Sequence, residues 1–341
     1  MSNIKLSWYP YTLELKHPFT ISNNSRTTTP AVLVEMEYEG MIGYGEASLP
    51  PYLKETQKSV QSFLAQIDLS SFDEKTDLSS VLSGIDNLSQ GNNAAKASID
   101  IALHDLVGKI KQLPVYKMYE IPKREVLTSC TIGIDSTEMI LNKLKEAENF
   151  SYIKVKLGTG DDRKLINTIR TETDKPIFAD INQGWKNREE ALELTQSFYE
   201  NNVLLIEQPF RKSNYKDTAW LTARSPIPII ADEAVQRLSD LDKIKDAYSG
   251  INIKLMKSTG ISEAYKMIIR ARQLNLKVML GCMTETSCAI SAAAHLSSLA
   301  DWVDLDGNIL INNDLFNGVK ATRGIIILND LPGLGINKIL L

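Results

Sequence analysis

Five short apolar runs between residues 152 and 258 decide the fold, and each of them carries charged or amide side chains toward its end. They are YIKVKLG (152–158), PIFADINQG (176–184), VLLIEQP (203–209), PIIADE (228–233) and INIKLMKS (251–258). Three more runs are VLTSCTIGI (126–134), KVMLGCM (277–283) and WVDLDG (302–307), and stretches long enough for helices separate all of them. Strands that alternate with helices in this way predict an α/β fold, a (β/α)8-type barrel with parallel strands and an active site at their carboxyl ends.

The residues before the barrel runs predict a second domain. Strand-like AVLVEMEYEG (31–40) and MIGYGEA (41–47) are joined by a turn at Glu39-Gly40, and helical material follows. In the segment 92–110 one helical face collects Ala95, Ile99, Ala102, Leu106 and Ile110, so we expect an amphipathic helix packed through that face. We therefore expect an α+β capping domain over 1–125, a barrel over 126–321 and a tail, 322–341, that returns to the capping domain.

Composition narrows the class of partner. Apolar residues make up 43% of the chain and charged residues 23%, as in globular proteins. The formal net charge is only -4, and no run of Lys and Arg with interleaved aromatics suggests nucleic acid, so we expect a small-molecule substrate. We find no signal peptide and no apolar stretch of the roughly 18 residues that a membrane span needs. The three cysteines lack CxxC spacing. We expect a cytoplasmic protein, and a homo-oligomer stays open.

Carboxylates at the ends of three successive runs predict a metal site. Strands buried on both faces are expected to be nearly continuous Val, Ile and Leu, yet these runs end in Asp180, Glu207 and Asp232. Neighbouring barrel strands would bring the three carboxylates together, and their mutual repulsion would raise their pKa values unless a cation neutralised them. Oxygen ligands favour Mg²⁺, and a chain with three histidines is a poor candidate for zinc or copper.

Lysines on the second and sixth runs predict acid/base chemistry. Lys156 and Lys254 would lie on opposite sides of the barrel mouth, where one could remove a proton and the other deliver one. We expect burial, the metal and the second lysine to lower the pKa of each toward that of a general base. We expect Lys154 to point differently from Lys156 and to add positive charge near the substrate, with pairing to a neighbouring barrel acid as the alternative.

The ordered segments KxK, ADINQGW, IEQP, ADE and NIKLMKSTG resemble the muconate-lactonizing-enzyme subgroup of the enolase superfamily. GYGEA and IDIALHDLVGK are similar to the capping domain of that family. The resemblance implies Asp180, Glu207 and Asp232 as Mg²⁺ ligands, and Lys156 and Lys254 as the acid/base pair. The usual GG after the second lysine motif is Thr259-Gly260 here, a departure that we expect to change the loop and not the lysine.

The eighth run bears on the reaction, because the subgroup includes cycloisomerases, o-succinylbenzoate synthases, N-acyl amino acid racemases and dipeptide epimerases. Asp304 and Asp306 are two residues apart on one face and suit an ammonium group. Such a DxD resembles the dipeptide epimerases, although one Asp could instead cap the following loop. We therefore predict an isomerase, a dipeptide epimerase that inverts the α-carbon of the C-terminal residue by a 1,1-proton transfer. The other reactions of the subgroup, and an inactive binding barrel, are the alternatives.

Three further residues are candidates for substrate binding. The segment HPFTISNNSRTTT (17–29) resembles the capping-domain loop that closes over substrate, so Arg26 could pair with an acidic side chain such as glutamate, or be an ordinary solvated charge. Met283, at the end of the seventh run, and Thr128, in the first run, are the other two.

Overall fold

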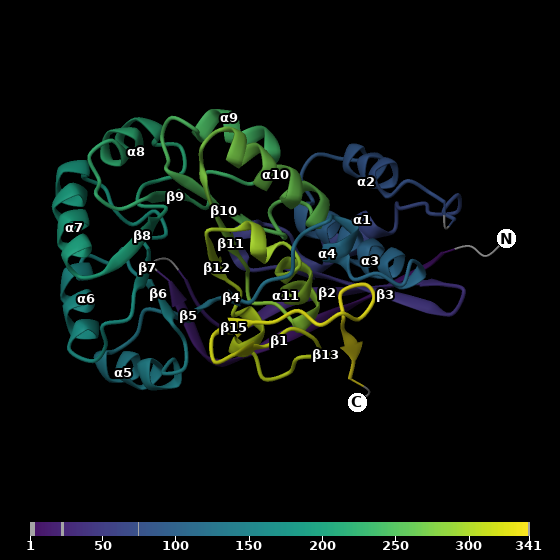
Figure 1. Ribbon diagram of the computed structural model, residues 1–341, viewed down its shortest axis with the longest axis horizontal. Helices are drawn as coiled ribbons and strands as arrows, with labels where there is room; N and C mark the ends of the chain where they lie inside the picture. The colour runs from purple at the N-terminus through teal and green to yellow at the C-terminus, as the bar shows by residue number, and fades with distance from the viewer. Residues whose placement is uncertain (1–3, 22–23, 74, 340–341) are drawn as a thin grey trace.

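The protein, described here by a computed structural model over residues 4–21, 24–73 and 75–339, consists of a barrel and a smaller sheet-and-helix part beside it (Figure 1). The smaller part begins with an antiparallel sheet of β1 (Lys5–Ile21), β2 (Asn24–Tyr38) and β3 (Met41–Ser48) in that order. Glu39 and Gly40 form the predicted turn between β2 and β3, both with positive φ, which matches the right-handed twist of the paired strands.

Four helices follow this sheet. They are α1 (Gln57–Leu64), α2 (Leu78–Asn87), α3 (Asn93–Ile110) and α4 (Val115–Met118). Helix α3 lies directly on β3, because a Cβ at Gly45 would fall 1.9 Å from the carbonyl oxygen of Ser98 and no larger residue fits there. The prediction that α3 packs through one face was wrong. Residues 94–108 are all buried, since the sheet covers one side while the barrel and the C-terminal tail cover the others.

Eight parallel strands form the barrel, in the order of the chain. They are β5 (Ser129–Ile132), β6 (Tyr152–Lys156), β7 (Ile177–Asp180), β8 (Val203–Glu207), β9 (Ile229–Ala231), β10 (Gly250–Lys254), β11 (Lys277–Gly281) and β12 (Trp302–Asp304). A parallel bridge between Thr128 and Val303 brings the first strand to the last. Seven of these strands lie within predicted runs, and β10 begins one residue before its run, at Gly250. The runs are informative because buried β-branched residues flanked by turn residues specify a central strand locally.

The barrel helices form an outer arc around these strands (Figure 1). They are α5 (Thr137–Glu146), α6 (Asp162–Arg170), α7 (Arg188–Glu200), α8 (Tyr215–Thr222), α9 (Leu241–Ile244) and α10 (Ile261–Gln273). A further helix, α11 (Ser287–Ala294), lies away from this arc and contacts β3 of the smaller part. None of the helices in the described part of the chain is long and apolar enough to cross a lipid bilayer.

The first predicted run is split in the structure. Its opening residues form β4 (Val126–Leu127), which pairs antiparallel with β15 (Ile325–Ile326), and β15 pairs with β14 (Ala321–Thr322). Later in the tail, β16 (Asn337–Lys338) pairs with β13 (Phe316–Asn317). The amide of Leu334 also donates to Asp105 of α3 at 2.9 Å, so the tail contacts both the barrel and the capping helices.

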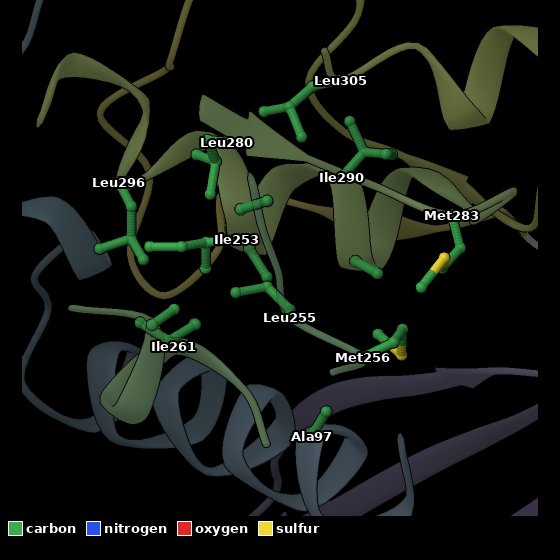
Figure 2. Close-up of a cluster of buried hydrophobic side chains, with 14 of the residues drawn as sticks. Ala97, Ile253, Leu255, Met256, Ile261, Leu280, Met283, Ile290, Leu296 and Leu305 are labelled. Atoms are coloured by element: carbon green, nitrogen blue, oxygen red, sulfur yellow. The ribbon is translucent and has the colours of Figure 1, made fainter. Parts of the chain in front are cut away.

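Two apolar regions hold the site in place. Phe178, Leu205, Ile230 and Met279 fill the barrel interior below the strand ends. At the junction of the two parts, Ala97 of α3 lies near Met256, which follows β10, in a cluster that also includes Ile253 and Ile261 (Figure 2). The capping helices are thereby packed against the barrel on the side of β10 and β11.

Candidate active site

A cavity of about 290 Å³ opens at the carboxyl ends of the barrel strands, and residues of both parts line it. The capping part contributes Phe19, Arg26, Pro51 and Tyr52. The barrel contributes Thr131, Lys154, Lys156, Asn182, Gln183, Asp232, Glu233, Lys254, Cys282, Met283, Thr284, Asp304, Asp306 and Leu310. Most of the predicted site residues are in this lining, and Asp180 and Glu207 lie buried beside them.

Asp180, Glu207 and Asp232 converge as a buried carboxylate cluster at the ends of β7 and β8 and just after β9. Each offers an oxygen within 4.8 Å of those of the other two. Asp180 and Glu207 are register partners in adjacent strands, which explains their proximity. Burial and the charge of Asp180 raise the pKa of Glu207. Three buried oxygen donors of this kind fit a hard divalent cation such as Mg²⁺.

Lys154 lies within this carboxylate cluster. Its Nζ is 2.7 Å from Glu207 Oε2, 2.7 Å from Asp304 Oδ2 and 3.4 Å from Asp180 Oδ2. Lys156 Nζ contacts the same Asp180 oxygen at 2.5 Å. The prediction that the two lysines point differently was wrong, because residues two apart on a strand share a face. Lys154 pairs with barrel acids, as in the alternative, and it also lines the cavity, so its positive charge near the substrate stays a prediction.

Lys254 approaches the carboxylate cluster from another strand. Its Nζ is 2.8 Å from Asp232 Oδ2 and 4.0 Å from Glu207 Oε1, whereas Lys156 contacts Asp180. The two lysines therefore contact different members of the cluster. Burial alone would lower the pKa of Lys254, but Asp232 and the other neighbouring acids outweigh burial and raise the pKa well above its usual value. In the protein alone these carboxylates favour the ammonium form, and the expected lowering, which depends in part on the metal, stays a prediction.

Asp304 and Asp306 differ in their surroundings although they are two residues apart. Asp304 accepts from Lys154 through Oδ2 and from Ser129 Oγ through Oδ1, both at 2.7 Å. Asp306 uses Oδ2 to accept from the amide of Thr131 at 2.6 Å. Burial and the charge of Asp304 raise the pKa of Asp306 to about 7. A cation supplied by a ligand would therefore meet Asp306 more readily than Asp304, which already has a lysine.

The capping part covers the cavity with a cation and two aromatic rings. Arg26 is paired with Phe19 across β1 and β2, and its guanidinium lies 5.0 Å from the centre of the Phe19 ring. The hydroxyl of Tyr52 donates to the sulfur of Met283 in a short contact. Arg26 is thus partly buried and contacted by Phe19 and Thr284, unlike an ordinary solvated charge, and burial lowers its pKa. Ser22 and Asn23, in the same predicted loop, lie outside the described residues.

Most of the chain matches known families. Residues 139–338 match the enolase C-terminal domain-like family, and residues 5–119 match the mandelate racemase / muconate lactonizing enzyme N-terminal domain. The chain belongs to the mandelate racemase / muconate lactonizing enzyme family. The resemblance to the enolase superfamily, read from short motifs in their order, is confirmed.

Individual members of this family are similar over almost the whole chain. A Bacteroides thetaiotaomicron protein named L-Ala-D/L-Glu epimerase is 52% identical over 98% of this chain and 88% of that protein. A substrate-liganded complex of the L-Ala-D/L-Glu epimerase from Bacillus subtilis has a TM-score of 0.94 and 28% identity over 100% of both chains. The dipeptide epimerase of Enterococcus faecalis V583, complexed with Mg and L-Leu-L-Tyr, has a TM-score of 0.90 and 30% identity over 98% and 99%. The predicted barrel with an N-terminal capping domain is confirmed.

One residue that was predicted to bind substrate, Thr128, does not line the cavity. Thr128 is buried at the barrel seam, where its Oγ1 accepts from the amide of Leu305 at 2.8 Å, so we no longer expect it to bind substrate. Thr131 lines the cavity instead. The alternation of side chains along a strand could have indicated this, because Ser129 and Thr131 lie on one face of the strand and Thr128 lies on the other. The face of Ser129 and Thr131 is the one that contacts Asp304.

Sequence reasoning also missed polar residues that surround the carboxylate cluster. Asn252 donates from Nδ2 to Glu207 Oε1 at 2.7 Å, and Lys257 donates to the carbonyl of Asp232 at 2.7 Å and to its carboxylate in a shorter contact. Glu233 lines the cavity. Asn252 precedes Lys254 by two residues on β10, so the strand period could have identified it, whereas Lys257 lies beyond the strand and gave no such signal.

Proposed function

We propose that this family member is a Mg²⁺-dependent dipeptide epimerase that inverts the α-carbon of the C-terminal residue of its substrate. The observation that carries the proposal is the buried carboxylate cluster contacted by Lys156 through Asp180 and by Lys254 through Asp232. Relatives named for dipeptide epimerisation, with 52% identity in one case, support the substrate class.

The two lysines account for inversion at carbon. One amine removes the α-proton from one face of the substrate, and the ammonium of the other returns a proton to the opposite face, so the centre inverts and no group is lost. Asp180, Glu207 and Asp232 would hold Mg²⁺, which would supply positive charge where the substrate carboxylate becomes more negative as the proton leaves. Lys154, held by Glu207 and Asp304, adds a second positive charge at this position.

Asp306 suits the free amino group of a dipeptide. It lines the cavity, and among the described residues its Oδ2 is held by an amide while no lysine or arginine pairs with the carboxylate. Cycloisomerases, o-succinylbenzoate synthases and N-acyl amino acid racemases act on substrates without this ammonium group, which makes them the weaker candidates. Cytoplasmic location and homo-oligomer formation stay predictions.

Proton exchange with solvent tests the reaction directly. Incubation of L-Ala-L-X dipeptides with the protein and Mg²⁺ in D₂O is expected to add one mass unit at the C-terminal residue and to yield the L,D epimer. Lys156→Ala and Lys254→Ala should each abolish epimerisation, because each removes one of the two proton carriers. Retained epimerisation in the double variant, or no exchange across the whole L,L and L,D dipeptide set, would contradict the proposal.

The position of Arg26 favours a substrate whose C-terminal residue has an acidic side chain. Its guanidinium lines the cavity, and a bidentate contact with a carboxylate is the pairing that a guanidinium favours. For Arg26→Met we expect the ratio of kcat/KM for L-Ala-L-Glu to that for L-Ala-L-Met to fall on the order of a hundredfold. Steady-state kinetics with both dipeptides measures it. An unchanged ratio would contradict the role of Arg26 and leave the epimerase reaction untouched.

A further inference from the structure

We propose that Thr284, a barrel residue, is a specificity-determining positioning residue that holds the Arg26 guanidinium over the cavity. The proposal rests on the proposed function and deepens it. It implies that preference for an acidic substrate side chain depends on a contact between the two domains and not on the capping hairpin alone.

Hydroxyl groups from both domains hold the guanidinium. Arg26 Nε donates to Thr29 Oγ1 at 3.0 Å within β2, and Arg26 Nη2 donates to Thr284 Oγ1 at 3.2 Å across the domain boundary. The ring of Phe19 lies against the cation and limits its movement in a third direction. Residue Arg26 thus has a fixed place although it lies on a hairpin that extends over the cavity.

Thr284 is itself held firmly. Its side chain is buried, and its carbonyl accepts from Ser48 Oγ of β3 at 2.6 Å. Two residues further, the amide of Thr286 donates to the carboxyl group of Glu46 at 3.0 Å. These contacts fix the segment after β11 to the capping sheet, so the Thr284 hydroxyl is a stationary acceptor for the arginine.

The remaining donors of Arg26 are available to a ligand. A guanidinium carries five N–H donors, and among residues 4–21, 24–73 and 75–339 only the two threonine hydroxyls accept from it. No carboxylate of those residues pairs with it, so its charge is uncompensated by the protein. An anionic side chain is the chemistry that completes this arrangement, and the orientation of the free donors depends on both hydroxyls.

Removal of the Thr284 hydroxyl at nearly constant shape tests the inference. In Thr284→Val we expect the kcat/KM ratio of L-Ala-L-Glu to L-Ala-L-Met to fall roughly tenfold, the size of one hydrogen bond to a charged group. Thr284→Ser, which keeps the hydroxyl, should keep the ratio. Should the valine variant not fold, Thr284→Ala serves in its place. An equal loss with both dipeptides would mean a merely structural role and would overturn the proposal.

A double-mutant cycle shows whether Thr284 acts through Arg26. In the Arg26→Met background, Thr284→Val should leave the ratio as it is, because no guanidinium remains to be positioned. The same tenfold fall in that background would overturn the proposal. A crystal structure of Thr284→Val needs no activity and is expected to have the guanidinium displaced from its wild-type position. An unmoved Arg26 in that structure would overturn the positioning role. Inactivity with every dipeptide would contradict the epimerase proposal and would leave the positioning role to be decided by the crystal structure.

Discussion

At the scale of single residues, neighbouring carboxylates of the same type take different partners. Asp304 is surrounded by Lys154, Ser129 and Thr131, and the lysine keeps the pKa of this carboxyl below its usual value despite burial. Asp306 has an amide on one oxygen and a raised pKa. An incoming ammonium would compensate the charge of Asp306, while Asp304 already serves to hold Lys154 beside the carboxylate cluster.

Substitutions at these two aspartates should therefore affect kcat/KM and Mg²⁺ affinity differently. For Asp306→Asn we expect kcat/KM for a dipeptide to fall roughly 30-fold or more, because a charged hydrogen-bond partner of the amino group is lost. Its affinity for Mg²⁺, measured by titration calorimetry, should stay near that of the wild type. For Asp304→Asn we expect the Mg²⁺ affinity to change as well, since Lys154 loses a counter-charge next to Glu207. Equal Mg²⁺ affinity in both variants would refute this distinction.

At the scale of elements, the connection from β10 to α10 shows why Thr259-Gly260 replaces a pair of glycines. Thr259 and Gly260 both have positive φ, +57° and +108°. Thr259 lies in the left-handed region that side chains can enter at some cost, and its hydroxyl contacts Glu263. At Gly260 a Cβ would lie 2.4 Å from the side chain of Asp100, whose oxygens accept from the amides of Ile261 and Ser262. A capping-domain residue therefore caps the first turn of a barrel helix.

Gly260→Ala is expected to be strongly destabilising. The added methyl group meets Asp100, and the backbone conformation is unfavourable for alanine, so we expect a loss of at least about 2 kcal/mol in the free energy of unfolding. Gly84→Ala is the matched control, because that glycine lies inside α2 with open space around it and should gain about 0.5–1 kcal/mol. Urea unfolding measures both. A Gly260→Ala protein as stable as the wild type would refute the account of this loop.

At the scale of the whole molecule, the segment after β11 joins the two domains through buried carboxyl groups. Glu46 of β3 accepts from the amide and hydroxyl of Thr286, and Glu285 accepts from the amide of Met283 at 3.0 Å. Burial raises the pKa of Glu46 to about 7 and, together with the charge of Glu46, that of Glu285 to about 8. Asp314 adds negative charge near Glu46, and Lys254 lowers the pKa of Glu285 only in part.

This pair should make the folded protein less stable as the pH rises. Between the ordinary value of 4.5 and about 8, the unfolded chain releases these protons while the folded protein retains them, so unfolding is favoured by increasing pH. The contribution is fully favourable below that window and lost above it. In thermal unfolding between pH 5 and about 8.5, the melting temperature should therefore fall less steeply with pH for Glu285→Gln than for the wild type. Parallel curves for the two proteins would count against a protonated carboxyl at this interface.

The sequence by itself determined the eight strands, their order and the meeting of Asp180, Glu207 and Asp232, because parallel strands of regular spacing place their carboxyl ends at one rim. It also predicted that Lys156 and Lys254 lie beside these carboxylates on different strands. These properties follow from local patterns repeated along the chain.

Only the tertiary structure decided which polar groups pair. Lys154 pairs with Asp304 and not with Asp306. Thr128 lies at the barrel seam, whereas Thr131 lines the cavity. Arg26 donates a hydrogen bond to Thr284, which is 258 positions later in the chain. The burial of α3 on all sides likewise depends on the barrel and the tail. Partners far apart in sequence leave no local periodicity, and their choice depends on how two domains pack and on which buried charge needs compensation.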